Sequence, residues 1–147
     1  MARVKVSTTI DAPPKVVWAQ LRDIGSHVEW MADAVAIRFV SDRTEGIGTA
    51  FECDTKVGPF RMTDQMVCTE WREAKVMGMR HVGVVEGTGR FTLERKRGGR
   101  TRFTWKEKLS FPWWMGGPFG GIVGGRILRR IWKRNLRLLK ATVEGRA

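Results

Sequence analysis

The 147-residue sequence predicts an α+β fold, in which a curved antiparallel sheet of about seven strands wraps around one long C-terminal helix. The first observation behind this prediction is the last third of the chain, where an apolar stripe shares a helix with a cationic half that contains no acid. The second is a series of short alternating segments separated by turns, with two short helices after the first segment. We therefore expect one domain, with the long helix lying across the concave side of the sheet.

The N-terminal segment 3–11 alternates apolar and polar residues, as a strand with one buried face does. Asp11 is expected to cap the short helix that follows. The two prolines after it suit the first turn of that helix. Trp18 is the large side chain expected to anchor this helix. After a glycine break, Ser26 is expected to cap a second short helix over residues 27–31.

Further strands are expected over residues 34–41, 51–57, 60–68, 74–81, 87–93 and 103–109. The second and third of these form a hairpin that reverses at a Gly-Pro pair. If Val57 lies opposite Phe60, then Cys53 lies opposite Asp64. The Asp64 carboxylate therefore falls on the inner, mostly apolar face of the sheet.

The last two strands meet at a glycine-rich turn whose length determines which residues face each other. A three-residue turn centred on Gly99 places Leu93 opposite Trp105 and Phe91 opposite Glu107. Two glycines upstream of Phe91 leave space at the inner face rather than filling it. Glu107 is thus predicted to be a second inward carboxylate.

The helix from about residue 122 to residue 143 follows a glycine-rich aromatic turn over residues 113–121, and Asn135 and Thr142 interrupt its apolar stripe. A buried amide without hydrogen-bond partners costs about 1–3 kcal/mol. Asn135 either bonds to sheet backbone or presents its amide to a ligand in a cavity beneath the helix. The sequence leaves both alternatives open.

The composition limits the function classes and the cellular location. No apolar run is long enough to span a membrane, and no signal-peptide core is present, so a cytoplasmic protein is expected. Cys53 and Cys68 lack the spacing of a metal or redox motif, so no metal and no cofactor are predicted and both thiols are expected to be reduced. The net charge of +12 is concentrated on the last helix and on residues 90–102. A solvated face is the default reading, and nucleic-acid binding is disfavoured.

The opening segment has the pattern Ile10-x-Ala12-Pro13-x-x-Val16-Val17-Trp18, and Trp30 follows it. This pattern resembles the start of the START-like helix-grip (SRPBCC) superfamily, which includes polyketide cyclase/dehydrase and lipid-transport proteins. The turn Phe111-Pro112-Trp113-Trp114 and the long helix carrying Asn135-Leu136 resemble its small actinobacterial members. The resemblance covers residues 1–147 as a single domain. It implies an apolar cavity between sheet and C-terminal helix, entered near the loop before that helix, and functions from lipid, sterol or quinone binding to polyketide cyclisation, hydrolysis and hormone sensing.

The first hypothesis is a protein that binds or transports a small hydrophobic ligand, such as a lipid, an isoprenoid quinone or a polyketide-like compound, in that cavity. Methionine and aromatic side chains would supply adaptable apolar contacts, although a plain filled core explains them too. His27 and His81 are expected at its rim. The residues predicted to contact the ligand are Trp30, Phe51, Met62, Asp64, Met66, His81, Phe91, Phe103, Trp105, Glu107, Trp113, Ile131, Asn135 and Leu138.

Two alternatives stay open. The first is an enzyme, a polyketide aromatase/cyclase or dehydratase with Glu107 or Asp64 as acid or base, because carboxyls in apolar cavities have raised pKa values. Against it, Glu107 could pair with Arg90 or Arg80, and Asp64 could lie in water at a strand end. The second is an interaction module whose basic helix contacts an anionic membrane, peripheral to its inner face, or nucleic acid. In that reading, the apolar cluster of Trp113, Trp114, Met115 and Phe119 enters the membrane interface.

Overall fold

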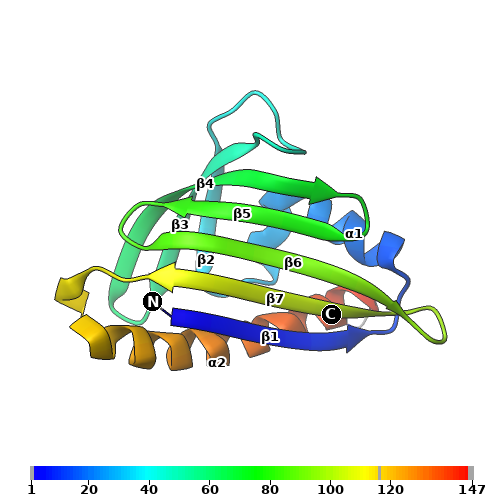
Figure 1. Cartoon of the computed structure of the whole chain (residues 1–147). Coiled ribbons are helices and arrows are strands. Elements are labelled where there is room, and N and C mark those ends of the chain that lie inside the picture. Colours follow the sequence, from blue (N-terminus) through cyan, green and yellow to red (C-terminus); the bar gives the residue numbers. More distant parts are fainter. Residues whose placement is uncertain (1, 116, 146–147) are drawn as a thin grey trace.

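The computed structural model describes residues 2–115 and 117–145 and has the predicted α+β architecture (Figure 1). Seven strands form one antiparallel sheet in the order β1-β7-β6-β5-β4-β3-β2. Two short helices follow β1 and one long helix ends the chain. The elements are β1 (Ala2–Ile10), α1 (Pro14–Arg22), η1 (Ile24–Glu29), β2 (Ala34–Phe39), β3 (Ala50–Val57), β4 (Phe60–Arg72), β5 (Val76–Val82), β6 (Glu86–Lys96), β7 (Arg100–Ser110), η2 (Trp113–Met115) and α2 (Gly117–Val143).

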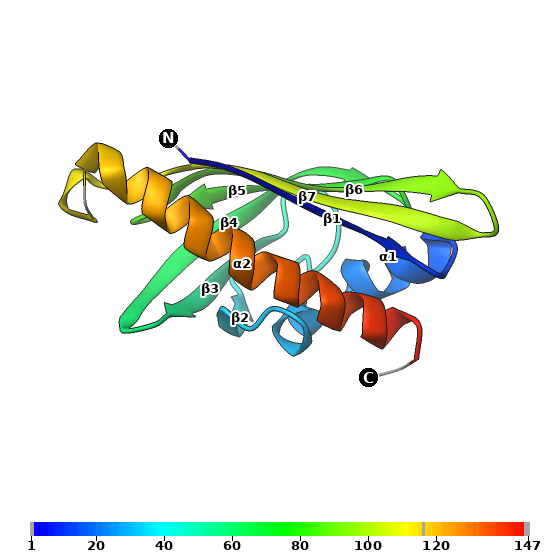
Figure 2. The same cartoon turned by 90° about the horizontal axis from the view of Figure 1, so that it is seen from below.

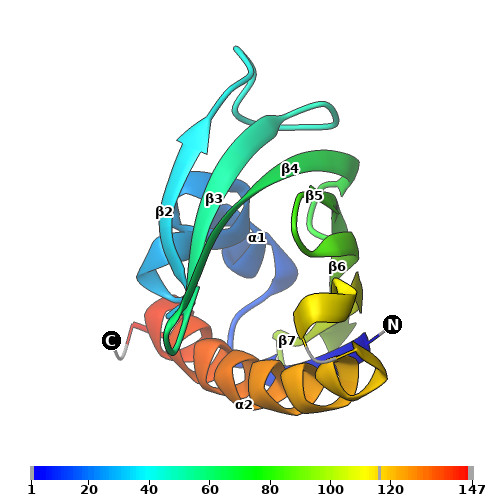
Figure 3. The same cartoon turned by 90° about the vertical axis from the view of Figure 1, so that its left-hand side faces the viewer.

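The sheet curls strongly, and α2 lies across its open side (Figures 2 and 3). Helix α2 packs along β1, where a Cβ on Gly125 would lie 3.7 Å from the Ala2 Cβ. The helices α1 and η1 close the far end of the curled sheet (Figure 3). This arrangement confirms the predicted fold, and side chains of the sheet and of α2 line a space between them.

The helix starts differ from the predicted ones. Helix α1 begins at Pro14, and its N-cap is Pro13, without a side-chain hydrogen bond. Asp11 is therefore not the cap, and its backbone N–H donates to the Glu144 carboxylate at 2.7 Å. The next element is a 3₁₀ helix over Ile24–Glu29 rather than residues 27–31, so Ser26 lies inside it, where its hydroxyl donates to a backbone carbonyl. Trp18 is buried and anchors α1, as predicted.

Helix α2 begins earlier than predicted. Gly117 is its first residue, so most of the glycine-rich segment predicted as a turn is helical. Gly116, also assigned to that turn, lies outside the described residues, as do the side chains of Met115 and Phe119. The predicted turn is reduced to the short η2 helix, which carries Trp113 and Trp114.

The β3–β4 hairpin has the predicted register. Val57 lies opposite Phe60, and Cys53 lies opposite Asp64. The two-residue turn fixes this pairing. As a consequence, every other residue of both strands faces the interior. Asp64 consequently lies on the concave face of the sheet.

In the β6–β7 hairpin the predicted residues face inward, but their cross-strand partners were predicted wrongly. Phe91 lies opposite Trp105, and Glu107 lies opposite Gly89, a shift of two residues from the predicted pairing. The turn consists of residues 97–99, one residue earlier than predicted, and both of its glycines have positive φ angles. Because glycine adopts this conformation without steric cost, the turn closes on the Gly-Gly pair.

An aromatic cluster forms the centre of the core. Trp105 stacks on Trp132 of α2, with ring centroids 4.3 Å apart, and Phe91 meets Trp105 edge-on at 5.3 Å. Trp30 and Phe103 are fully buried beside them. Such ring pairs add about 0.5–1.5 kcal/mol each beyond the area they bury. The cluster thus fixes α2 against β7 and forms one wall of the space beneath the helix.

Candidate functional site

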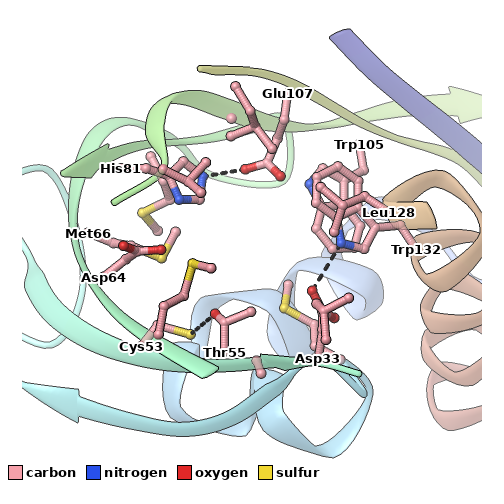
Figure 4. Close-up of a pocket in the computed structure, with 18 of the residues that line it drawn as sticks. Asp33, Cys53, Thr55, Asp64, Met66, His81, Trp105, Glu107, Leu128 and Trp132 are labelled. Carbon is pink, nitrogen blue, oxygen red and sulfur yellow. Dashed lines mark hydrogen bonds and ion pairs between the residues drawn. The ribbon is translucent and has the colours of Figure 1, made fainter. Parts of the chain in front are cut away.

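A cavity of about 410 Å³ lies between the concave face of the sheet and α2. This volume falls within the range of about 300–1,000 Å³ that is usual for small-molecule sites. Apolar side chains dominate its walls, among them four methionines of β4 and β5 and the stacked Trp105 and Trp132. Figure 4 shows a small number of polar groups set among them. The cavity has the composition of a site for a hydrophobic molecule with few polar atoms.

The structure brings most of the predicted contact residues together at this cavity. Those that line it are Phe51, Met62, Asp64, Met66, His81, Phe91, Trp105 and Glu107. Those that lie outside its lining are Trp30, Phe103, Trp113, Ile131, Asn135 and Leu138. Trp30 and Phe103 lie within the core, whereas Leu138 is exposed on the surface of α2.

Asn135 is fully buried, and its amide is bonded to the loop before β2. Its Oδ1 accepts the backbone N–H of Ala32 at 3.0 Å, and its Nδ2 donates to Asp33 Oδ1 at 2.8 Å. Trp132 Nε1 donates to the other Asp33 oxygen at 3.1 Å (Figure 4). The amide partners are therefore neither sheet backbone nor a ligand. Asp33 itself lines the cavity, and no sequence pattern had pointed to it.

Glu107 pairs with His81 across strand β6. His81 Nε2 and Glu107 Oε1 are in hydrogen-bonding contact, so neither Arg90 nor Arg80 is its partner (Figure 4). Gly89 lies between them on β6, where a Cβ would come within 2.8 Å of Glu107 Cγ. The missing side chain lets the Glu107 carboxylate reach His81, which lies two strands away in the sheet.

The surroundings of His81 favour the protonated form of its imidazole. Burial lowers the pKa of His81, but the charge of Glu107, the hydrogen bond to Glu107 and the charge of Asp64 outweigh it and raise that pKa above the usual value. The pair therefore holds its proton at a higher pH than a free imidazole would. A proton shared between a base and an acid in an apolar cavity can be passed to a bound molecule.

Asp64 lies on the cavity wall next to His81 and is 5% exposed, so it is not in water at a strand end (Figure 4). Burial raises the pKa of Asp64, and the charge of His81 and the backbone amides of Val84 and Val85 offset part of that rise. Within the described chain, Asp64 Oδ1 is buried and accepts no hydrogen bond. That oxygen packs against Gly83 in the β5–β6 turn, where a Cβ would collide with it.

Two further titratable groups of the lining, His27 and Cys53, are uncharged at neutral pH. His27 is buried rather than at the rim, and its Nε2 donates to the Leu21 carbonyl at 2.7 Å. Burial lowers the pKa of His27 to about 4, although the Leu21 carbonyl and Asp23 favour its charged form. Burial likewise raises the pKa of the Cys53 thiol to about 11. Both side chains therefore contribute shape rather than charge at neutral pH.

Exposed apolar side chains gather at one end of the cavity. Phe60 at the tip of the β3–β4 hairpin, Trp114 of η2, and Val123 and Ile127 of α2 all line the cavity and are all more than 40% exposed. We call these four residues the apolar rim. They come from three separate elements, so they mark the side on which the cavity opens to solvent.

Comparisons with known proteins agree with this architecture. The family described as polyketide cyclase / dehydrase and lipid transport matches residues 1–144. No curated protein matches the sequence. Among solved structures, the ZhuI aromatase/cyclase of Streptomyces sp. R1128 has a TM-score of 0.79 at 17% identity, covering 98% of this chain and 94% of its own.

Two further solved structures have the same fold. A START superfamily protein of Mycobacterium smegmatis has a TM-score of 0.82 at 9% identity, with both chains covered over 100% of their length. The protein TTHA0849 of Thermus thermophilus has a TM-score of 0.81 at 16% identity, with 97% of each chain covered. At these identities the likeness shows the helix-grip fold alone.

Proposed function

Because the chain belongs to the polyketide cyclase/dehydrase and lipid-transport family, we propose that it binds a small hydrophobic molecule between the sheet and α2. The observation that carries this proposal is the cavity of about 410 Å³ with its mostly apolar walls. A lipid, an isoprenoid quinone or a polyketide-like compound fits this chemistry. Burial of apolar ligand surface drives binding by about 25 cal/mol per Å², while the few polar groups orient one end of the ligand.

Native mass spectrometry of the purified protein, alone and after incubation with a panel of lipids and quinones, tests this proposal. We expect a discrete adduct that solvent extraction releases. In the Met66→Trp variant, the larger ring occupies the cavity, so affinity should fall at least about tenfold. Val67→Trp is the matched control, because alternate residues of a strand point to opposite faces and Val67 is not part of the cavity lining. A bare apo mass throughout, or equal loss in both variants, would contradict the proposal.

The alternative function is catalytic, as an aromatase/cyclase or dehydratase. It is favoured by one observation, the His81–Glu107 pair beside Asp64 in a single apolar cavity. In this reading Glu107 and Asp64 act as acid or base, removing and returning the protons that enolisation and dehydration of a polyketide chain require. Either residue would act together with His81.

The Glu107→Gln variant separates the two functions. It keeps the size of the side chain and removes the acid–base group. A binding protein should keep its ligand affinity within about threefold, whereas an enzyme should lose about 10²–10⁴-fold in turnover. The measurement is ligand affinity by calorimetry beside turnover of a linear poly-β-ketone. Unchanged turnover in both Glu107→Gln and Asp64→Asn would rule out the acid–base roles.

The apolar rim supports a second partner, an anionic membrane surface from which the ligand is taken. Arg126 and Arg130 lie next to the rim on α2 and are exposed, and no acid separates them. Aromatic and aliphatic side chains flanked by cations are the combination that binds the interface of an anionic bilayer, with about 1 kcal/mol from each cation near the surface. No helix in the described part of the chain is long and apolar enough to cross a bilayer.

Sedimentation with lipid vesicles tests this contact. We expect binding to vesicles with about 30% phosphatidylglycerol, weaker binding at high salt, and little binding to pure phosphatidylcholine. Trp114→Ser should reduce it about tenfold, because it removes an interfacial indole. Val35→Ser on the edge strand β2 also removes an exposed apolar side chain and is the control. Equal binding by the two variants, or no dependence on anionic lipid, would exclude the rim as a membrane contact.

A further inference from the structure

We infer that His81 selects the ligand of this cavity: its Nδ1–H, which the protein leaves without a partner, donates a hydrogen bond to an uncharged carbonyl oxygen of the bound molecule. Ligands of the same size that lack such an acceptor, or that end in a carboxylate, bind less tightly. This inference rests on the proposed binding function and makes it more specific. It follows from the nitrogen that Glu107 occupies, the groups around the other nitrogen and the charges that line the cavity.

Glu107 occupies one of the two ring nitrogens of His81. The bond joins His81 Nε2 to Glu107 Oε1, and a carboxylate oxygen can only accept, so Nε2 is the donor. The charges of Glu107 and Asp64 both favour the protonated ring. Because both nitrogens of an imidazolium carry a proton, Nδ1 is a second N–H donor.

This second donor has no partner in the protein. Nδ1 takes part in no hydrogen bond within the described residues, and it is not one of their fully buried polar atoms. The cross-strand neighbours of His81 are Met66 on β4 and Gly87 on β6. A thioether is a weak acceptor and a glycine has no side chain, so neither neighbouring side chain satisfies the donor.

A molecule in the cavity can reach this nitrogen. His81 lines the cavity, and 15% of its side chain is exposed, against 6% of the Glu107 side chain. Its ring lies between Glu107 and Met66 at the cavity wall (Figure 4). Nδ1 therefore differs from Asp64 Oδ1, which is buried against Gly83.

A ligand that displaces water from Nδ1 must replace the hydrogen bond that the water made. A donor that becomes buried without an acceptor loses its full hydration free energy, and the loss is larger for a charged donor. A hydrocarbon leaves the N–H of His81 unpaired, whereas a carbonyl oxygen pairs with it. The donor therefore distinguishes ligands of equal size by the presence of an acceptor.

The charges of the lining favour an uncharged acceptor. Three acidic side chains line the cavity, those of Asp33, Asp64 and Glu107. Arg90 is the single Arg or Lys among the described lining residues, and its guanidinium is bonded to Glu70 of β4 at 2.8 and 3.0 Å. The charge of His81 is already balanced by Glu107, so a ligand carboxylate would lose hydration without a free cation to compensate for it.

The donor lies between the aromatic wall of the cavity and its apolar rim. Trp105, Glu107 and Leu109 are alternate residues of β7 and all line the cavity, and the chain then continues to Trp114 of the rim. Alternate residues of a strand are about 7 Å apart, so the Glu107 backbone lies about this distance along β7 from that of Trp105. A carbonyl bonded to His81 would thus place an attached flat apolar group against Trp105, as an aromatic ketone can.

Three probes of similar size test the inference: 2-acetylnaphthalene, 2-isopropylnaphthalene and 2-naphthoate. Their affinities are measured by equilibrium dialysis at about pH 6, where His81 is protonated and the naphthoate is ionised. We expect the ketone to bind at least about tenfold more tightly than the hydrocarbon, as a hydrogen bond from a charged donor predicts. We expect the naphthoate to bind at least about tenfold more weakly than the ketone.

Nuclear magnetic resonance of protein with isotope-labelled histidine identifies the nitrogen involved, because the chain has only two histidines. We expect the ketone to shift the Nδ1 resonance of His81 and the hydrocarbon to leave it nearly unchanged. The resonances of His27, whose Nε2 is bonded to the Leu21 carbonyl, serve as the internal control. Tighter binding of the ketone without a change at His81 Nδ1 would show that another group is the donor.

The double variant His81→Phe/Glu107→Leu removes the donor together with its buried partner. No buried charge is then left unpaired, so the fold and the affinity for the hydrocarbon should be retained within about threefold. The preference for ketone over hydrocarbon should fall below about threefold. Arg80→Gln, at the preceding and exposed position of β5, is the control that should leave all three affinities unchanged.

Three outcomes would overturn the inference while leaving the binding function intact. These are equal binding of ketone and hydrocarbon, tightest binding of the naphthoate, and a ketone preference that survives in the double variant. The hydrocarbon reports on the proposed function separately, because its binding needs only the apolar walls. Failure of both the hydrocarbon and the ketone to bind would contradict the proposed function and this inference with it.

Discussion

Asn135→Ala is expected to lower the free energy of unfolding by about 3–5 kcal/mol. The substitution leaves the Ala32 N–H without its acceptor and removes one donor from the Asp33 carboxylate. It also opens a void beneath a fully buried position of α2. This one amide joins the C-terminal helix to a loop 103 residues away in sequence, so its loss should weaken the closure of α2 over the cavity.

Urea unfolding followed by far-ultraviolet circular dichroism measures the effect. Arg137→Ala, on the exposed side of the same helix, is the control and should change stability by less than about 0.5 kcal/mol. Asn135→Asp should also destabilise the fold, because it places a second carboxylate beside Asp33. A stable Asn135→Ala protein with lost ligand affinity would show instead that the amide serves the ligand.

The strands and helices of this fold could be predicted from local sequence patterns, but which residues pair across neighbouring strands depended on turn geometry. The Gly-Pro turn has two residues and therefore fixed the placement of Asp64 on the inner face. The turn over residues 97–99 has the predicted length of three residues but is centred on Gly98 rather than Gly99, because either glycine can occupy the left-handed conformation. That ambiguity made the predicted cross-strand partner of Glu107 Phe91 instead of Gly89, two residues away. Glu107 stays on the inner face in both registers.

The His81–Glu107 pair shows which structural information a sequence pattern does not contain. Glu107 and Asp64 could be recognised as inward carboxylates from alternation alone. The His81–Glu107 contact crosses an intervening strand and depends on the absence of a side chain at Gly89. The glycine was recognised as a source of space, but which residues use that space is a three-dimensional property.

Asn135 shows the same limit for the helix. Its position within an apolar stripe indicated that its amide needs partners. Those partners, Ala32 and Asp33, lie in a loop without a distinguishing sequence pattern, so the choice between sheet backbone and ligand missed the actual contact. A polar residue in a buried stripe predicts that a bond exists, and only the tertiary structure identifies the other group.

His27 is expected to make the fold sensitive to acid. Its pKa is about 4 in the folded protein, because burial disfavours the imidazolium, and about 6.5 in the unfolded chain. The unfolded state therefore binds more protons than the native state between these values, and stability falls as the pH drops below about 6.5. At about 1.36 kcal/mol per pKa unit, this histidine alone should remove about 3 kcal/mol by pH 4.

The second histidine should act in the opposite direction. Because the pKa of His81 is raised in the folded state, its contribution is fully present below about pH 6.5 and is lost as the pH rises through the folded value. Urea unfolding of the wild type, His27→Gln and His81→Gln between about pH 4 and 8 separates the two contributions, since carboxylate effects shared by all three proteins cancel in the differences. The His27→Gln curve should be flatter by about 3 kcal/mol on the acid side. A His27 proton resonance that titrates near its ordinary pKa of about 6.5 would show that the ring is accessible to water, and the acid sensitivity would then have another source.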